Sequence, residues 1–421
     1  MRKYNYSILV IFVFAFFMGV VSFSFAQSKK EIKEAKKQRD KYLFNVKLTD
    51  KNVSETIHFK LQKDVVFIPV TINGKTYNFV FDTGAITVFS DSVAKELNSI
   101  QSEYSVMVSD AAGIEKKMNF YHTDNVQVGS LQFNNVCYAV ENLDIFEKHL
   151  CMRTDGLLGT NMMRLLNWEI DFSNQTITVS DKPFLATDYR MEIPFRETFS
   201  RNPEIKMEMG EYYFWAILDM GNNDLIQIPD SIFFTHRESS YLKYAKGEGK
   251  DTETLFNDET PQNQYVAEID SFYIGNNLIV KEIVCISPSP MILIGNSFLE
   301  QYGKIAINWK QKKIFLGEKN ENKVIENDTI WEFVPNLQDN KLIVSFIWEN
   351  TNLYKEGVRV GDQIVRINGI STEKIDSPQW CEISEEIKNL DNLTVEILKP
   401  TGEKITVLHK KTTYKSLIES R

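Results

Sequence analysis

Two aspartates in this sequence stand at the end of apolar runs, and each is followed two positions later by a glycine. Asp82 ends "YNFVFD" and begins the loop Asp82-Thr83-Gly84-Ala85, while Asp219 ends "YYFWAILD" and begins Asp219-Met220-Gly221-Asn222. A charged residue at the end of a core strand is costly to bury unless it is hydrogen-bonded or used in chemistry. Asp82 therefore either starts an ordinary turn or is a carboxylate placed in the interior for a reaction.

A pair of such carboxylates could perform general acid–base catalysis. Two carboxylates about 3 Å apart share one proton, because they do not both ionise easily. The ionised partner can take a proton from a bound water while the other donates to a substrate carbonyl oxygen. This chemistry hydrolyses an amide without a metal or a cofactor. Gly84 and Gly221 allow a tight turn behind each carboxylate, and the Thr83 hydroxyl can tie the two loops together.

The elements that would position the aspartates form an internal repeat. Asp82 stands 77 positions before Gly159 of "GLLG", and Asp219 stands 76 positions before Gly295 of "ILIG". Each half also contains a strand–turn–strand pattern between these anchors and a tryptophan-containing strand pair after them. We expect a mainly β fold with two duplicated lobes, residues 61–183 and 184–318, that bring the aspartates together across their seam. Near the start of the first lobe, Asn73-Gly74 predicts a hairpin turn.

"FVFDTGAITVFS" resembles the catalytic loop of the aspartic proteases, and Ala85 is more like the retropepsin branch than the pepsin branch. "GLLG" and "ILIG" are similar to the hydrophobic-hydrophobic-glycine element of that family, and the resemblance spans residues 61–318. It implies β-barrel lobes, a catalytic dyad of Asp82 and Asp219, and an extended polypeptide substrate. It also implies a flap over the substrate, formed by "VMVSDAAGIEKKMNF" with Asp110 and Gly113.

The second loop departs from the family pattern at Met220, where a threonine or serine is usual. Methionine has no hydroxyl with which to brace the loops. Three outcomes follow: a slower enzyme, an enzyme braced in another way, or a retired protease that only binds peptides. A homodimer in which each lobe pairs with another chain is a weaker alternative, because one chain already supplies two aspartates.

A third unit follows the polar stretch "EKNENKVIENDT", which predicts a linker. Residues 328–412 resemble a PDZ domain, most specifically in "EGVRVGDQIVRINGI". The resemblance implies an α+β domain that could capture the C-terminus of a peptide by adding it to a sheet edge. The alternative is a packing module that stabilises the lobes.

The N-terminus is typical of an exported protein. Arg2 and Lys3 precede an apolar run, Ile8 to Val21, and Ser24 and Ala26 precede Gln27. This pattern predicts a signal peptide over residues 1–26 and a periplasmic or extracellular location; contact with a membrane is expected only if the segment stays uncleaved. Residues 27–60 predict a charged helical lead-in, either a spacer or a segment that inhibits the enzyme until removed.

The remaining composition mostly excludes other functions. The net charge of −9 gives no basic surface for nucleic acid. The histidines and the four cysteines show no zinc spacing, so we expect no metal site, although one disulfide is possible in an exported chain. Lys246–Gln264 predicts a mobile loop or a second substrate flap. Four acidic residues are interpreted as turn or surface groups: Asp110, Asp155, Asp171 and Asp224.

Overall fold

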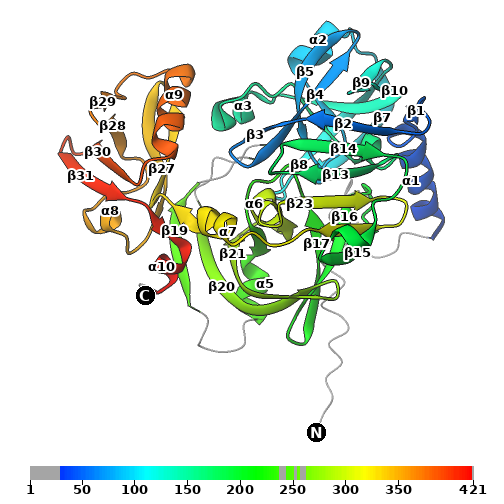
Figure 1. Ribbon diagram of the computed structural model, residues 1–421. Coiled ribbons are helices and arrows are strands. Elements are labelled where there is room, and N and C mark those ends of the chain that lie inside the picture. Colours follow the sequence, from blue (N-terminus) through cyan, green and yellow to red (C-terminus); the bar gives the residue numbers. More distant parts are fainter. Residues whose placement is uncertain (1–28, 237–242, 251–253, 257–261, 420–421) are drawn as a thin grey trace.

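The computed structural model describes residues 29–236, 243–250, 254–256 and 262–419 (Figure 1). The fold is mainly β, with 47% strand and 19% helix, and its sheets are barrel-like. This confirms the predicted fold class. The predicted signal peptide lies outside the described residues, and none of the described helices has the length and apolar character needed to cross a membrane.

The first half is built on an 11-stranded sheet. Its strands are β1 (Lys47–Leu48), β3 (Lys60–Gln62), β4 (Val65–Ile72), β5 (Lys75–Phe81), β6 (Val88–Ser90), β7 (Gln101–Ser109), β8 (Glu115–Thr123), β9 (Val126–Val128), β10 (Leu131–Asn134), β11 (Val136–Glu141) and β12 (Gly156–Leu158). Three short helices accompany them: α2 (Asp91–Glu96), α3 (Asp144–Leu150) and α4 (Thr160–Met163). The predicted hairpin is confirmed, since β4 and β5 pair antiparallel around Asn73 and Gly74, which both have positive φ.

The second half contributes a comparable set of elements. They are β16 (Pro203–Met209), β17 (Tyr212–Leu218), β18 (Ile226–Pro229), α5 (Asp230–His236), β19 (Tyr244–Gly249), β20 (Gln262–Ile274), β21 (Asn277–Ser287), β22 (Leu293–Ile294) and α6 (Asn296–Glu300). The strand ends of the predicted loop 246–264 are therefore ordered β-structure in β19 and β20. Residues 251–253 and 257–261 of that loop lie outside the described residues.

Six strands from the two halves join in one sheet, in the order β2-β14-β13-β23-β24-β15. They are β2 (Ser54–His58), β13 (Asn167–Asp171), β14 (Thr176–Ser180), β15 (Met191–Glu197), β23 (Lys304–Asn308) and β24 (Lys313–Leu316), with a 3-10 turn at Ala186–Asp188 before β15. The centre of the sheet is the antiparallel pair of β13 and β23, in which Trp168 lies opposite Ile307. This sheet fixes the two halves to each other through backbone hydrogen bonds.

The same strand pairing occurs once in each half around the aspartate-bearing loops. In the first half β12 pairs parallel with β5 and antiparallel with β6, and β6 pairs parallel with β11. In the second half β22 pairs parallel with β17 and antiparallel with β18, and β18 pairs parallel with β21. The repeat found in the sequence therefore corresponds to a repeated arrangement of strands.

The lead-in before residue 61 is only partly helical. Helix α1 (Lys29–Tyr42) covers only the first part of this stretch, and the chain then forms β1, β2 and β3. Phe44, Ile57 and Phe59 are buried in the hydrophobic core. Residues 43–60 are thus part of the fold and do not form a plain spacer, while removal of an inhibitory segment stays a prediction.

The C-terminal unit has a hydrophobic core of its own. Its elements are α7 (Glu321–Asp328), β25 (Thr329–Ile330), β26 (Phe333–Gln338), β27 (Lys341–Trp348), α8 (Asn352–Lys355), β28 (Gln363–Ile367), β29 (Ile370–Ser371), α9 (Ser377–Lys388), β30 (Asn392–Leu398), β31 (Lys404–Lys410), β32 (Thr412–Thr413) and α10 (Tyr414–Glu419). Helix α7 occupies the stretch that the sequence predicted as a linker.

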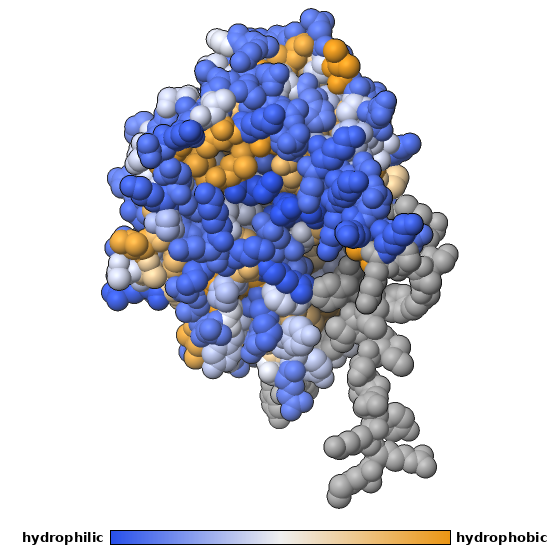
Figure 2. Space-filling model, turned by 90° about the vertical axis from the view of Figure 1, so that its right-hand side faces the viewer, coloured by the Kyte–Doolittle hydropathy of each residue, from blue (hydrophilic) through white to orange (hydrophobic). Residues whose placement is uncertain are grey.

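The C-terminal unit is attached to both halves of the molecule (Figure 1). Strand β27 pairs antiparallel with β19 of the second half, with Gly247 opposite Trp348 and Gly249 opposite Phe346. A disulfide between Cys151 and Cys381 joins the end of α3 in the first half to α9. Figure 2 shows a face of the molecule that is mostly hydrophilic with scattered apolar patches, as expected when most large apolar side chains are internal.

Candidate active site

The two aspartates occupy equivalent positions in the repeated strand arrangement. The amide of Asp82 donates to the carbonyl oxygen of Leu158 at 3.0 Å, and the amide of Asp219 donates to that of Ile294 at 3.0 Å. Each aspartate thus leaves its strand beside the last residue before a glycine, Gly159 or Gly295. The sequence placed both carboxylates at strand ends, and the fold brings the two strand ends together.

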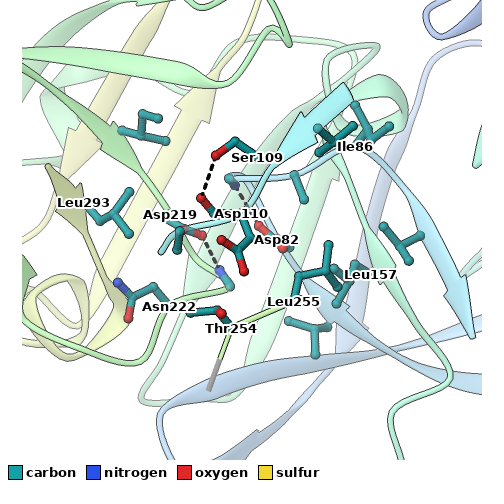
Figure 3. Close-up of a pocket in the computed structure, with 18 of the residues that line it drawn as sticks. Asp82, Ile86, Ser109, Asp110, Leu157, Asp219, Asn222, Thr254, Leu255 and Leu293 are labelled. Atoms are coloured by element: carbon teal, nitrogen blue, oxygen red, sulfur yellow. Dashed lines mark hydrogen bonds between the residues drawn. The ribbon is translucent and has the colours of Figure 1, made fainter. Parts of the chain in front are cut away.

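The two glycines that follow the aspartates lie directly against the opposite carboxyl group. A Cβ atom on Gly84 would lie 2.5 Å from the carboxyl carbon of Asp219, and one on Gly221 would lie 2.5 Å from that of Asp82. Real Cβ atoms do not approach so closely, so only glycine fits at either position. The reciprocal contact shows that Asp82 and Asp219 face each other across the seam (Figure 3).

Each carboxylate also accepts backbone hydrogen bonds from its own loop. The Gly84 amide donates to Asp82 Oδ1 at 2.7 Å, and the Gly221 amide donates to Asp219 Oδ1 at 3.0 Å. The next amides, of Ala85 and Asn222, face these carboxylates and act to lower their pKa. The loop residues named from the sequence therefore surround the pair as expected from their spacing.

The environment of the pair favours retention of a proton. Burial raises the pKa of Asp82 well above its usual range, and the neighbouring Asp219 carboxylate raises it further. Burial likewise raises the pKa of Asp219. Asp82 is only 8% exposed, whereas Asp219 is partly exposed toward the cleft. The structure therefore supports a pair of carboxyl groups that shares one proton.

Thr83 holds the two loops together from one side. Its hydroxyl donates to the carbonyl oxygen of Leu218 at 2.6 Å and accepts from the amide of Met220 at 3.0 Å. The Met220 side chain is fully buried. The first loop thus supplies a hydroxyl brace to the second, and the second loop participates through its backbone alone.

Two asparagines that the sequence reading missed brace the same loops. The side-chain amide of Asn202 donates to the carbonyl oxygen of Thr83 at 3.0 Å, and that of Asn296 donates to the carbonyl oxygen of Met220 at 2.7 Å. Both asparagines are fully buried. Asn296 directly follows the "ILIG" element, so alignment of the repeats could have drawn attention to it. Nothing in the sequence marks Asn202.

The two repeated glycine elements, "GLLG" and "ILIG", pack directly against the aspartate loops. A Cβ atom on Gly159 would lie 2.2 Å from the carbonyl carbon of Ile86, and one on Gly295 would lie 2.3 Å from the carbonyl oxygen of Asp224. The residues after them, Thr160 and Asn296, donate their amides to the carbonyl oxygens of Ala85 and Asn222. Both elements therefore back the aspartate loops at close range.

The predicted flap is a hairpin of β7 and β8 whose tip rests on the second half. Ser289 donates its hydroxyl to the carbonyl oxygen of Ala111 at 2.6 Å. A Cβ atom on Gly113 would lie 2.9 Å from Cγ of Pro290. Asp110 accepts the amides of Ala112 and Ile114 and so fixes the turn at the tip. The tip thus bridges to the second half, and Asp110 and Ala111 line the same cavity as the two aspartates.

A cavity of about 210 Å³ is lined by the tip of this hairpin and by the two aspartates, which lie between Leu293 and Leu157 (Figure 3). Most of its wall is apolar and comes from the first half. The wall includes Val80, Ile86, Val88, Val106, Val108, Met118, Phe120, Phe146, Leu150, Leu157 and, from the second half, Leu255, Met291 and Leu293. Such a cavity can hold an apolar side chain next to the carboxylates.

The family comparison agrees with this geometry. Residues 68–162 match the family model described as aspartyl protease. The match contains Asp82 and lies within the first half of the chain.

The chain is also similar to several solved structures. A retropepsin-like aspartic protease from Rickettsia conorii shares 18% identity over 31% of this chain and 94% of its own, with a TM-score of 0.23. The aspartic proteinase from Irpex lacteus shares 13% sequence identity over 63% of this chain and 98% of its own, with a TM-score of 0.36. Basic 7S globulin from soybean shares 9% sequence identity over 65% of this chain and 97% of its own, with a TM-score of 0.39. No curated protein matches the chain.

Some sequence interpretations need correction. Asp110 and Asp155 are buried, so neither is a surface group, although Asp110 does lie in a turn, at the tip of the flap. Asp155 accepts the Asn78 amide and pairs with Arg153. These contacts fix the start of the "GLLG" element against β5. Asp171 accepts the Asn174 amide in a turn, as predicted. The part of the chain that the structure describes contains no cluster of metal-ligating side chains.

Proposed function

We propose that the protein is an aspartic endopeptidase that uses Asp82 and Asp219 to activate a water molecule. The observation that carries this proposal is the reciprocal contact of Gly84 with Asp219 and of Gly221 with Asp82. That contact brings together two carboxyl groups from the ends of equivalent strands, which is the arrangement required for a shared proton.

The reaction follows from the electrostatics of the pair. The protonated carboxyl of the pair donates to the carbonyl oxygen of the scissile peptide bond as the oxygen gains negative charge. The ionised partner takes a proton from a water lying between the carboxyls, and that water attacks the carbonyl carbon. The proton taken from water then passes to the leaving nitrogen, so the dyad returns to one shared proton.

Cleavage of a peptide library by residues 27–421 tests the proposal. The library is incubated from pH 3 to 8, and products are read by mass spectrometry. We expect Asp82→Asn and Asp219→Asn each to abolish cleavage, while Asp188→Asn, a substitution of the same kind at an exposed turn, leaves it unchanged. Loss with Asp82→Asn alone would contradict the pairing of the two loops.

The second candidate is a peptide-binding protein without activity, and Met220 is the observation that favours it. The brace between the loops has one hydroxyl, that of Thr83. If no peptide is cleaved at any pH and peptides still bind the cleft, this candidate replaces the first.

We also propose that the C-terminal unit is a PDZ-like peptide-binding domain. In support, β26 pairs on one edge with β27, and no strand of the described residues pairs with its other edge. An extended peptide could add to that edge. Peptides with a free C-terminus should bind more tightly than the same peptides with an amidated C-terminus, measured by fluorescence anisotropy. Equal affinity would favour a packing module.

Export is the third part of the proposal. The signal pattern at Ile8–Val21 with Ser24 and Ala26 supports it, and so does the Cys151–Cys381 disulfide, because disulfides persist mainly in oxidising compartments. N-terminal sequencing of the protein recovered from its native cells should begin at Gln27. A protein beginning at residue 1 would contradict cleavage.

A further inference from the structure

A short segment of the second half reaches into the cavity wall of the first. Residues 254–256 belong to the connection between β19 and β20, yet Thr254 and Leu255 line the cavity together with Asp82 and Asp219 (Figure 3). Leu255 and Phe256 pack against a core cluster of the first half that contains Leu157. Residues 254–256 of the second half therefore lie against the first half of the molecule, across the seam between the two halves.

This segment is fastened to the tip of the flap. The Phe256 amide donates to Asp110 Oδ2 at 3.1 Å. The other oxygen of Asp110 accepts the amides of Ala112 and Ile114, at 3.0 Å and 2.9 Å. Lys116 Nζ lies 5.6 Å from the centre of the Phe256 ring. One buried carboxylate thus shapes the flap and holds the segment in place.

Leu255 consequently occupies space that a substrate side chain would need. The cavity of about 210 Å³ is enclosed on its apolar side by residues of the first half, and Leu255 completes that side from the second half. The volume left beside the carboxylates depends on the size of the side chain at this position. A hydrophobic pocket discriminates between ligands by about 10-fold or more for each methylene that fits or fails to fit.

We propose that Leu255 is a specificity-determining residue, which limits the size of the apolar substrate side chain that enters this cavity. The inference rests on the proposed function, because it names a substrate feature of the same site. Truncation of Leu255 enlarges the cavity and shifts the preference toward larger side chains, and a larger residue at 255 shifts it toward smaller ones.

The test uses peptides that share one cleaved sequence and differ at a single position, which carries alanine, leucine, phenylalanine or tryptophan. For Leu255→Ala we expect the kcat/KM ratio of the tryptophan to the alanine peptide to rise by about 10-fold, and for Leu255→Phe we expect it to fall. Leu278→Ala is the matched control, since Leu278 is 51% exposed on β21. This variant should keep the wild-type ratio.

Two results would overturn the inference. An unchanged ratio in both Leu255 variants would show that no substrate side chain reaches this residue. An equal rise for every peptide would show that the segment obstructs the cleft without selecting side chains. Dissociation constants of the same peptides, measured with the Asp219→Asn variant, separate this inference from the proposed function. If Leu255→Ala in the Asp219→Asn background shifts Kd according to the size of the varied side chain, the role of Leu255 is supported, even when the protein with both aspartates cleaves no peptide and the proposed function fails. If Leu255→Ala does not shift Kd, the role of Leu255 is overturned.

Discussion

The Thr83 hydroxyl accepts a hydrogen bond of 3.0 Å from the amide of Met220 and donates one of 2.6 Å to the carbonyl oxygen of Leu218. Because Met220 takes part only through its backbone, the two aspartate loops are braced by a single hydroxyl. Asn202 and Asn296 add one side-chain hydrogen bond to each loop. The second loop thus has no hydroxyl at Met220 to match that of Thr83, so the brace between the loops is asymmetric. The asparagine side chains supply the additional hydrogen bonds to the two loops.

This asymmetry predicts unequal effects of substitution at the two positions. Thr83→Val removes the hydroxyl and leaves a buried amide and a buried carbonyl without this partner, so we expect a loss of stability of about 1–3 kcal/mol and a marked fall in kcat. Denaturant unfolding and peptide cleavage measure the two effects.

Met220→Leu provides the contrast, because it keeps the backbone contacts and nearly the same volume. It should cost less than about 1.5 kcal/mol and leave kcat near the wild-type value. Thr56→Val, at an exposed position on β2, controls for the loss of a threonine. A larger effect of Met220→Leu than of Thr83→Val would contradict the bracing scheme.

The close approach of Gly84 to the opposite carboxyl group predicts that a single methyl disrupts the site. In Gly84→Ala the new carbon would lie 2.5 Å from Asp219, so the loops must separate. We expect loss of cleavage and a destabilisation of about 1–3 kcal/mol from overpacking. Gly221→Ala should behave in the same way, because the contact is reciprocal. Wild-type activity in either variant would show that the carboxyls do not face each other.

The raised pKa of Asp82 predicts the direction of the pH dependence of stability. A carboxyl group whose pKa is higher in the folded than in the unfolded protein contributes stability that is fully present below the unfolded value, near 3.8, and is lost as the pH rises through the folded value. Asp82→Asn cannot ionise and lacks this loss. Its Tm should therefore equal or fall below that of the wild type at pH 3.5 and exceed it at pH 7.5.

Thermal unfolding at both pH values checks this prediction, with Asp188→Asn as a control for the chemical change alone. A constant difference in Tm between Asp82→Asn and the wild type would contradict a raised pKa. Activity of the wild type should decline at high pH for the same reason, since the pair then loses the shared proton that the reaction needs.

The disulfide predicts a dependence of stability on oxidation. Cys151 and Cys381 are separated by 230 positions, and a crosslink over a long stretch restricts the unfolded chain strongly, typically by about 2–5 kcal/mol. A reducing agent should lower the Tm of the wild type. The double variant Cys151→Ala/Cys381→Ala should have the lower Tm already and show no further response, whereas Cys137→Ala should keep the response.

Much of the fold followed from local patterns. Asn73-Gly74 specified its turn because both residues adopt positive φ at little cost. The failures occurred where a pattern was weak or polar. The stretch Glu321–Asp328 was interpreted as a linker, although it forms a helix, and residues 43–60 were interpreted as a lead-in, although Phe44 and Ile57 complete the core. Short strands such as β1 and β3 have too few residues to show alternation.

The sequence by itself determined the chemistry that the site can hold: two aspartates after apolar strands, glycines behind them and a repeat that places both in equivalent surroundings. Such features depend on neighbouring residues and on spacing. Only the tertiary structure decided which distant groups meet, including Asn202 with Thr83, Leu255 with the cavity of the first half, and Cys151 with Cys381. These contacts join residues far apart in the chain, and their formation depends on the packing of all the elements between them.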